Sequence, residues 1–280
     1  MAVASLTALG GVIVTTGHDT GHTQPGPHTA SVAAVAHVGD PDDPATWTLP
    51  VQTYVPTPHQ ARAVMGSRDE LMKACMTRAG FPHWRPSPDL PALGGTNDMD
   101  ARYGINDLDQ ARQFGYHPDA QAQKQYDDAI NADIAARAKV GQKALLDCAG
   151  KADQVAPAVR IPQLIDRIDG DSWKQAQTEP AVKKAFADWS ACMDGKGYHY
   201  AKPMDANDDG TWWESETATS REKAVAVADV QCRDKYHVER VWFDTEAGLQ
   251  QKAIRQHAVT LDRLREGMQA AVARAAEVAR

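Results

Sequence analysis

The sequence predicts a mainly α-helical domain stapled by disulfides, and three observations support that prediction. Alanine is abundant while aromatic residues make up only 6% of the 280 residues, a balance that suits helices better than sheets. Apolar side chains recur at helical spacing in several stretches. Four cysteines lie in such stretches, two of which share a motif. The shared motif indicates two copies of one helix-cysteine unit.

Charge and hydropathy exclude two classes of protein. The chain carries 30 Lys and Arg residues against 37 Asp and Glu residues, for a net charge of −7. Because nucleic-acid binding needs a basic face for the phosphates, we expect no nucleic-acid partner. No apolar run reaches the roughly 18 residues of a membrane-spanning helix.

The N-terminal region predicts export. Residues 1–16, MAVASLTALGGVIVTT, are small and apolar and have the length of an export-signal core. The basic residues expected before such a core are missing, so we interpret it as incomplete, with a buried strand or helix as the alternative. Residues 17–46 are rich in Gly, Pro, Thr, His and Asp without an apolar period, which predicts a disordered linker. We expect ordered structure to begin near Trp47.

Two segments share a pattern at an offset of 117 residues. Residues 74–86 are ACMTRAGFPHWRP and residues 191–203 are ACMDGKGYHYAKP, and each follows a helical stretch. Gly80 and Gly197 would each be the left-handed residue that ends a helix. The aromatic residue after each glycine would pack on the methionine four positions before it. We therefore predict two Schellman helix stops rather than a catalytic role for the methionines or aromatics.

Each copy of the pattern contributes two cysteines. Cys75 and Cys192 lie in the repeated pattern, while Cys148 and Cys232 lie in later Ala-rich helical stretches. An even number of cysteines together with an export signal favours disulfides over a zinc site or reactive thiols. Pairing within each copy, Cys75 with Cys148 and Cys192 with Cys232, respects the duplication.

Three further strings are distinctive: WTLPVQTYVPT at 47–57, RYGINDLDQARQFGYH at 102–117 and EKAVAVADVQCRDK at 222–235. With the paired Cys-Met-x-x-x-Gly-aromatic motifs, they resemble a group of exported actinobacterial proteins of unassigned activity. The resemblance spans roughly residues 46–265. It implies export and a helical, disulfide-bonded fold, and it supplies no catalytic residues.

The final segment, 238–280, predicts one long amphipathic helix that follows a first helical repeat at 47–160 and a second at 161–237. It contains no proline, and its apolar residues recur at three-four spacing over four heptads. Its balanced charges disfavour a membrane or nucleic-acid helix. We expect packing on the domain at its start and a partner, self-association or fraying at its end. The candidate partner-binding stripe comprises Ile254, Leu261, Leu264 and Met268.

One segment matches a calcium loop. Residues 205–216, DANDDGTWWESE, place side-chain oxygens at positions 1, 3, 5 and 12 of an EF-hand loop and glycine at position 6. The predicted Ca²⁺ ligands are Asp205, Asn207, Asp209, Thr211 and Glu216. Pro203 leaves no room for the usual incoming helix and Trp213 stands at position 9, so an Asx-rich turn is the alternative.

No common catalytic motif accompanies these features. The sequence lacks the nucleophile-elbow, phosphate-loop, dinucleotide and zinc-protease signatures, and scattered carboxylates do not identify a glycosidase. We expect an exported, non-catalytic binding or scaffold protein of the cell envelope, whose partner is an envelope protein or a cell-wall component. The alternatives are a calcium-stabilised binding module and a wall-active hydrolase with carboxylate chemistry. Trp212 and Trp213 could also form a platform for a sugar.

Overall fold

The computed structural model describes most of the chain after residue 35, and the described residues belong to one compact unit, Val32–Arg280. The predicted export-signal core at 1–16 lies outside the described residues, as does most of the predicted linker at 17–46. The described residues are 36–41, 43–87, 90, 98–158 and 160–278.

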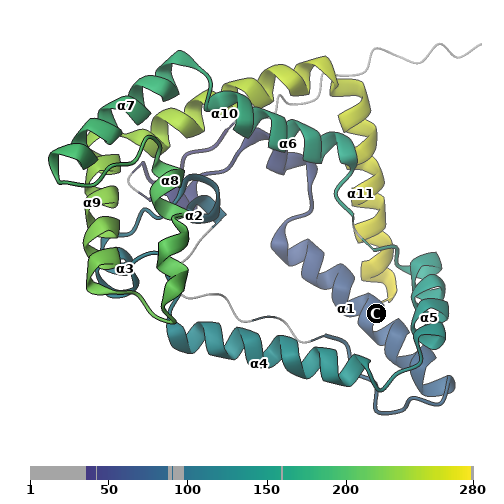
Figure 1. Ribbon diagram of the computed structural model, residues 1–280. Helices are drawn as coiled ribbons and strands as arrows, with labels where there is room; N and C mark the ends of the chain where they lie inside the picture. The colour runs from purple at the N-terminus through teal and green to yellow at the C-terminus, as the bar shows by residue number, and fades with distance from the viewer. Residues whose placement is uncertain (1–35, 42, 88–89, 91–97, 159, 279–280) are drawn as a thin grey trace, which may run out of the picture. The chain divides into compact units, whose positions relative to one another are not determined.

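Helices dominate the described part of the chain (Figure 1). In this part of the chain, β-type pairing consists of one isolated antiparallel bridge between His37 and Thr48. None of these helices is both long and apolar enough to cross a bilayer. The predicted mainly α fold class is confirmed. The elements are η1 (Pro44–Thr46), η2 (Pro50–Tyr54), α1 (Pro58–Arg78), α2 (Asp98–Tyr103), α3 (Leu108–Phe114), α4 (Ala120–Arg137), α5 (Gln142–Val155), α6 (Gln163–Ala176), α7 (Pro180–Gly195), α8 (Pro203–Asn207), η3 (Gly210–Glu214), α9 (Ser220–Tyr236), α10 (Val238–Gln256) and α11 (Ala258–Val278).

Ordered structure begins before Trp47, earlier than the sequence indicates. The His37 N–H donates to the Thr48 carbonyl at 2.9 Å, and the Thr48 N–H returns a bond to His37 at 2.8 Å. The buried Trp47 indole donates to the Asp40 carbonyl at 2.8 Å. The described end of the predicted linker, residues 36–41 and 43–46, is therefore structured, because the anchored tryptophan holds the chain before it in place.

Both predicted helix stops have the Schellman geometry. Gly80 (φ 93) and Gly197 (φ 87) are left-handed and follow α1 and α7. In each stop the N–H of the aromatic residue donates to the carbonyl of the methionine four positions before the glycine, and both side chains pack in one cluster. The pairs are Phe81 with Met76 (2.9 Å) and Tyr198 with Met193 (3.0 Å). This prediction is confirmed.

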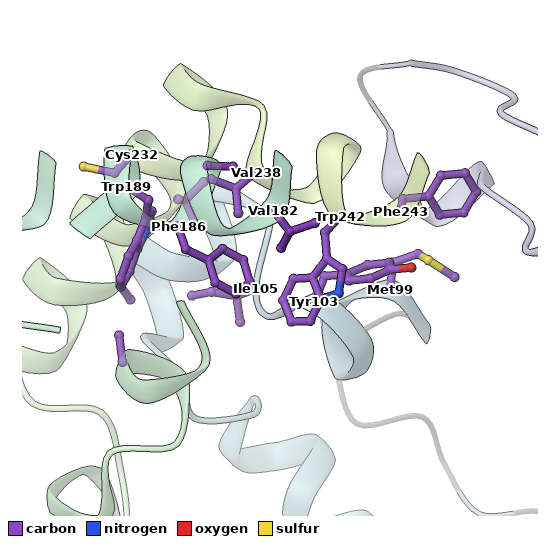
Figure 2. Close-up of a cluster of buried hydrophobic side chains, with 14 of the residues drawn as sticks. Met99, Tyr103, Ile105, Val182, Phe186, Trp189, Cys232, Val238, Trp242 and Phe243 are labelled. Atoms are coloured by element: carbon purple, nitrogen blue, oxygen red, sulfur yellow. The ribbon is translucent and has the colours of Figure 1, made fainter. Parts of the chain in front are cut away.

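The largest cluster of buried side chains, the main core, draws on both predicted repeats. Figure 2 shows Tyr103 of α2 close to Trp242 of α10, and their ring centroids lie 5.1 Å apart. Phe186 of α7 meets the same indole edge-on at 5.0 Å. Because α2 and α3 come from the first predicted repeat, the boundary at residue 160 does not separate two independently packed units. The bulky members of the main core are Trp47, Leu49, Met99, Tyr103, Ile105, Tyr116, Val182, Phe186, Trp189, Met193, Trp212, Val225, Val230, Val238, Trp242 and Phe243.

A second packing region forms where α1 contacts α5 and α11. The Ser67 hydroxyl donates to the Ala275 carbonyl at 2.8 Å, which ties α1 to the end of α11. The end of α1 and α5 share a small cluster, the cysteine cluster, which is separate from the main core. It comprises buried Cys75, Met76 and Cys148 with partly buried Met72, Phe81, Trp84, Val140, Ala144 and Leu145.

The predicted single helix over 238–280 is wrong, although a long C-terminal helix, α11, is present. α10 ends at Gln256 and α11 begins at Ala258, with His257 (φ −115) between them outside the helical region (Figure 1). The break lets the two helices pack on different neighbours. α10 contacts α6 and α7, whereas α11 contacts α1.

The cysteines pair within each copy, as predicted. Cys75 is bonded to Cys148 and Cys192 to Cys232, with Cα separations of 5.6 and 5.9 Å. Each bond joins a helix that ends in a Schellman stop to a later helix, α1 to α5 and α7 to α9. In the chain-entropy account, closing loops of this length stabilises the folded state by about 4 kcal/mol each.

Replacing one disulfide should loosen one region and leave the other protected. For Cys75→Ala/Cys148→Ala we expect faster hydrogen exchange in α1 and α5 with α7, α9 and α10 retained, because the cysteine cluster is separate from the main core. Mass-spectrometric hydrogen exchange on oxidised protein measures this. Cys192→Ala/Cys232→Ala is the matched control and should expose the main core. Equal loss of protection in both variants would contradict the division.

Candidate functional site

The residues of the predicted calcium loop do not converge on one point. Asp205 and Asn207 lie in α8, where successive side chains point in different directions around the helix. Asp209 instead begins η3: its Oδ1 accepts from the Thr211 N–H at 2.9 Å, a bond that lowers the pKa of Asp209. Among the described residues, no group of three or more His, Cys, Asp or Glu side chains could hold a metal ion. The geometry is that of the alternative, an Asx-rich turn.

Only one of the two adjacent tryptophans is available to a ligand. Trp212 is buried and its indole donates to the Ala206 carbonyl at 2.7 Å. Trp213 is 60% exposed and lies against His117, with ring centroids 4.9 Å apart. A platform formed by both rings is therefore not present.

The predicted partner stripe of the C-terminal region is covered by the chain itself. Ile254 and Leu261 are buried, and Leu264 and Met268 are partly buried on the same cluster. That cluster also contains Val51, Tyr54, Ile165 and Ile168, from η2 and α6. The assignment of a partner surface is corrected for Ile254 and Leu261, because both are buried by packing within the chain, whereas Leu264 and Met268 are only partly covered.

A buried ion pair lies at the centre of the main core. Arg233 and Asp229, one turn apart on α9, are both almost fully buried, and Arg233 Nε donates to Asp229 Oδ1 at 2.6 Å. The carboxylate also accepts from Trp189 Nε1 at 2.9 Å and the Tyr116 hydroxyl at 3.0 Å. Burial, followed by the nearby Asp229 charge, raises the pKa of Tyr116, so its hydroxyl stays a donor. The guanidinium also donates to the Tyr103 carbonyl.

Gly104 makes room for this guanidinium. Its φ of 93 is left-handed, and a β-carbon there would lie 2.5 Å from Arg233 Nη2. Gly80 has the same φ, but a β-carbon at Gly80 would meet nothing within 4 Å. The two glycines therefore share a backbone φ, but only Gly104 has a neighbouring side chain where a β-carbon would lie.

A second buried carboxylate is fully partnered. Glu246 accepts from Arg102 Nε at 3.0 Å, from the Tyr103 hydroxyl at 2.8 Å and from Gln250 Nε2 at 3.0 Å. Arg102 also pairs with Asp169 at the edge of the core. A buried charge needs an oppositely charged partner and hydrogen bonds of this kind.

Glu239, in the first turn of α10, is different. Its side chain is buried, Oε1 has no hydrogen-bond partner among the described residues, and the Arg233 guanidinium is 4.0 Å away. Burial raises the pKa of Glu239 to about 8, with Arg233 opposing the rise and Asp229, Asp100 and Asp234 adding to it. A carboxyl shifted in this way marks a functional-site candidate.

A groove beside the first disulfide gathers basic and aromatic side chains. Its cavity of about 420 Å³ lies between the loop after α1 and the end of α4. Phe81 and Trp84 are also part of the cysteine cluster, so their rings are held by the cross-linked helices. We call this cavity the basic groove. Its lining includes Phe81, His83, Trp84, Arg85, Arg137, Lys139 and Val140.

Charge is strongly segregated around the basic groove. Residues 71–87 contain three basic residues and no acidic residue, and residues 134–151 contain four basic residues against Asp147 alone. An adjoining cavity of about 450 Å³ shares Phe81 and adds Arg78, Lys143 and Lys151. Among the described residues, Arg78, Arg85 and Lys139 form no ion pair. This surface can therefore attract an anion in spite of the negative net charge.

Sequence reasoning missed the basic groove. The local signal was present, since a stretch with three basic and no acidic residues surrounds the string FPHWRP. Its proximity to Arg137 and Lys139, more than 50 positions later, depends on how the end of α4 meets the loop after α1. The net charge of the whole chain is negative, so it does not reveal this local excess of positive charge.

Comparison of the chain with protein families, with curated proteins and with solved structures finds no match. Function must therefore be argued from the basic groove and from the buried polar groups themselves.

Alanine at the two left-handed glycines should have unequal effects on stability. Gly104→Ala should cost at least about 2 kcal/mol more than Gly80→Ala, because only the first displaces a buried, hydrogen-bonded guanidinium. Chemical denaturation of both variants measures the difference. Equal losses would show that the backbone conformation alone sets the cost.

Stability should fall with rising pH because of Glu239. A carboxyl whose pKa rises from 4.5 to about 8 on folding keeps its proton in the folded state where the unfolded state has lost it. Its contribution is thus complete below about pH 4.5 and is lost by about pH 8, at no more than about 1.4 kcal/mol per pH unit. Denaturant unfolding between pH 5 and 9 measures the slope. Glu239→Gln should flatten it, and a parallel slope in that variant would refute the assignment.

Proposed function

We propose that the protein is an exported, non-catalytic binding protein of the cell envelope that captures an anionic glycopolymer in the basic groove. The observation that carries the proposal is the gathering of Arg85 and Lys139, which form no ion pair among the described residues, with half-buried aromatic rings on an otherwise acidic chain. The proposal places the ligand on the loop after α1 and the end of α4, and not on the C-terminal stripe.

Electrostatics supports an anionic ligand. Arg85 and Lys139 have no ion-pair partner among the described residues, so binding an anion would not first require breaking a salt bridge. Arg137 is the exception, since it pairs with Asp133 at 2.7 Å. Exposed cations of this kind raise the local concentration of a polyanion and speed its association.

The aromatic side chains support a ligand that carries rings. Phe81 and Trp84 are partly exposed but rest on the cysteine cluster, which holds them in place without burying their outer faces. Rigid, half-exposed aromatic rings beside a few polar groups are the usual lining of ligand sites, and they offer apolar faces for sugar rings. Charge and stacking together favour an acidic polysaccharide over a simple anion.

The compartment favours a wall polymer over nucleic acid. Two disulfides, Cys75–Cys148 and Cys192–Cys232, persist where the environment is oxidising, outside the cytoplasm. The polyanions met there by an exported protein are chiefly polymers of the envelope. The first disulfide lines the adjoining cavity and packs in one cluster with Phe81 and Trp84 of the basic groove, so the ligand site would depend on the oxidised state.

Charge reversal in the basic groove should weaken polyanion binding. We expect Arg85→Glu/Lys139→Glu to weaken binding of polygalacturonate at least about tenfold, because two unpaired cations become anions. Affinity is measured by titration calorimetry at low and moderate salt, and neutral dextran should not bind. Trp84→Ala should weaken binding further by removing a stacking face.

The matched control is Lys183→Glu/Lys252→Glu, which makes the same charge change on exposed positions of α7 and α10 and should alter affinity less than about twofold. Two outcomes would overturn the proposal. One is equal weakening in both double variants. The other is groove-dependent binding of single-stranded DNA that is as tight as binding of the polysaccharide.

A further inference from the structure

A second cavity adjoins the basic groove at Phe81, whose side chain lines both. Its volume is about 450 Å³, and it lies between the end of α1 and α5. Cys75 and Cys148, the cysteines of the first disulfide, also line it. We call it the disulfide cavity. The two helices that form its walls are therefore held together by a cross-link as well as by packing.

The exposed charges of the disulfide cavity are mostly positive. Arg78 at the end of α1 and Lys151 on α5 are exposed and form no ion pair among the described residues. Lys143 Nζ donates to Asp147 Oδ2 at 2.6 Å, and this bond lowers the pKa of Asp147. Among the described residues that line the cavity, Asp147 is the one acidic residue against three basic residues. The disulfide cavity therefore carries net positive charge, like the basic groove.

Three of these side chains share one face of α5. Lys143, Asp147 and Lys151 are spaced by four positions, so they follow one another along the helix. The Lys143–Asp147 pair is exposed, at 87% and 54% of the two side chains, and a pair of this kind contributes little to stability. An anionic group of a ligand can therefore take the place of Asp147 at little cost. Lys143 and Lys151 are about 12 Å apart along the helix axis, a spacing that only an extended ligand covers.

Phe81 connects the two cavities. It is half-buried and packs in the cysteine cluster, so its ring is held in place where the cavities meet. Gly141, just before α5, lies beside this ring, because a β-carbon there would be 3.6 Å from Phe81 Cζ. No side chain at position 141 covers the ring. A ligand that stacks on Phe81 can therefore place neighbouring units in both cavities.

We propose that the basic groove and the disulfide cavity form one extended site, which binds a segment of several acidic sugars and not a single acidic sugar. The inference rests on the proposed function and adds the length of the ligand to it. Arg85 and Lys139 hold one end of the segment. Phe81 stacks on a ring in the middle, and Arg78 and Lys151 hold the other end. Because one chain binds both halves, the second contact is intramolecular and affinity rises with length.

Oligogalacturonates of defined length test the extended site on the oxidised wild-type chain. Titrations followed by backbone-amide NMR measure both tight and weak dissociation constants and show which residues respond. We expect digalacturonate to shift amides around Trp84 and not those of 146–152. Octagalacturonate should shift both groups and bind at least about tenfold more tightly. Equal shifts of 146–152 by digalacturonate would reveal two separate sites and overturn the proposal.

Neutral substitutions separate the disulfide cavity from the basic groove. Arg78→Gln/Lys151→Gln should weaken octagalacturonate binding at least about fivefold and digalacturonate binding less than about twofold. Each length is compared between wild type and variant, so the extra registers that a longer chain offers cancel. The matched control, Lys183→Gln/Lys252→Gln, makes the same charge change at exposed positions of α7 and α10 and should alter neither affinity. Circular dichroism checks that each variant is folded.

Asp147→Asn should act in the opposite direction. It removes the carboxylate from the disulfide cavity and frees Lys143, so octagalacturonate should bind at least about twofold more tightly while digalacturonate is unaffected. Weaker octagalacturonate binding in Asp147→Asn, or unchanged binding in the double variant of the disulfide cavity, would overturn the extended site. The proposed function still stands in that case if charge reversal in the basic groove weakens polygalacturonate binding. If neither double variant weakens binding, both proposals fail.

Discussion

The rest of the structure depends on the burial of the Arg233 guanidinium. A charge at this depth is tolerated only when it is paired and hydrogen-bonded, and here each of the three guanidinium nitrogens donates to Asp229 or to the Tyr103 carbonyl. That requirement brings α2 to α9, and Gly104 must lack a side chain where the guanidinium passes. Trp189 and Tyr116 complete the shell of the carboxylate, which links α7 and the chain after α3 to the same point.

The same local device serves two different surroundings. Each Schellman stop turns the chain after a cross-linked helix, but around Gly197 it is packed into the main core and around Gly80 it supports a surface. The second setting leaves Phe81 and Trp84 half exposed next to the basic side chains of Arg85 and Lys139. A motif that only ends a helix in one place therefore positions a candidate ligand site in the other.

The buried polar groups differ in how completely they are satisfied, and this difference separates structure from function. Glu246 accepts hydrogen bonds from a guanidinium, a hydroxyl and an amide, so its role is structural. Glu239 differs, because its Oε1 accepts no hydrogen bond among the described residues and the Arg233 guanidinium is 4.0 Å away.

The sequence by itself determined the helical class, both helix stops and the cysteine pairing, because caps, periodicity and the duplicated motif are local signals. Tertiary structure alone decided the rest. The apolar stripe around Leu261 predicts a partner surface, but in the structure it packs against residues of η2 and α6. The acidic loop at 205–216 matches the spacing of calcium ligands in sequence. In the structure its residues lie in two different elements, α8 and η3, and their side chains point in different directions. Spacing records which side chains share a helix face, but contact between distant segments decides what that face meets.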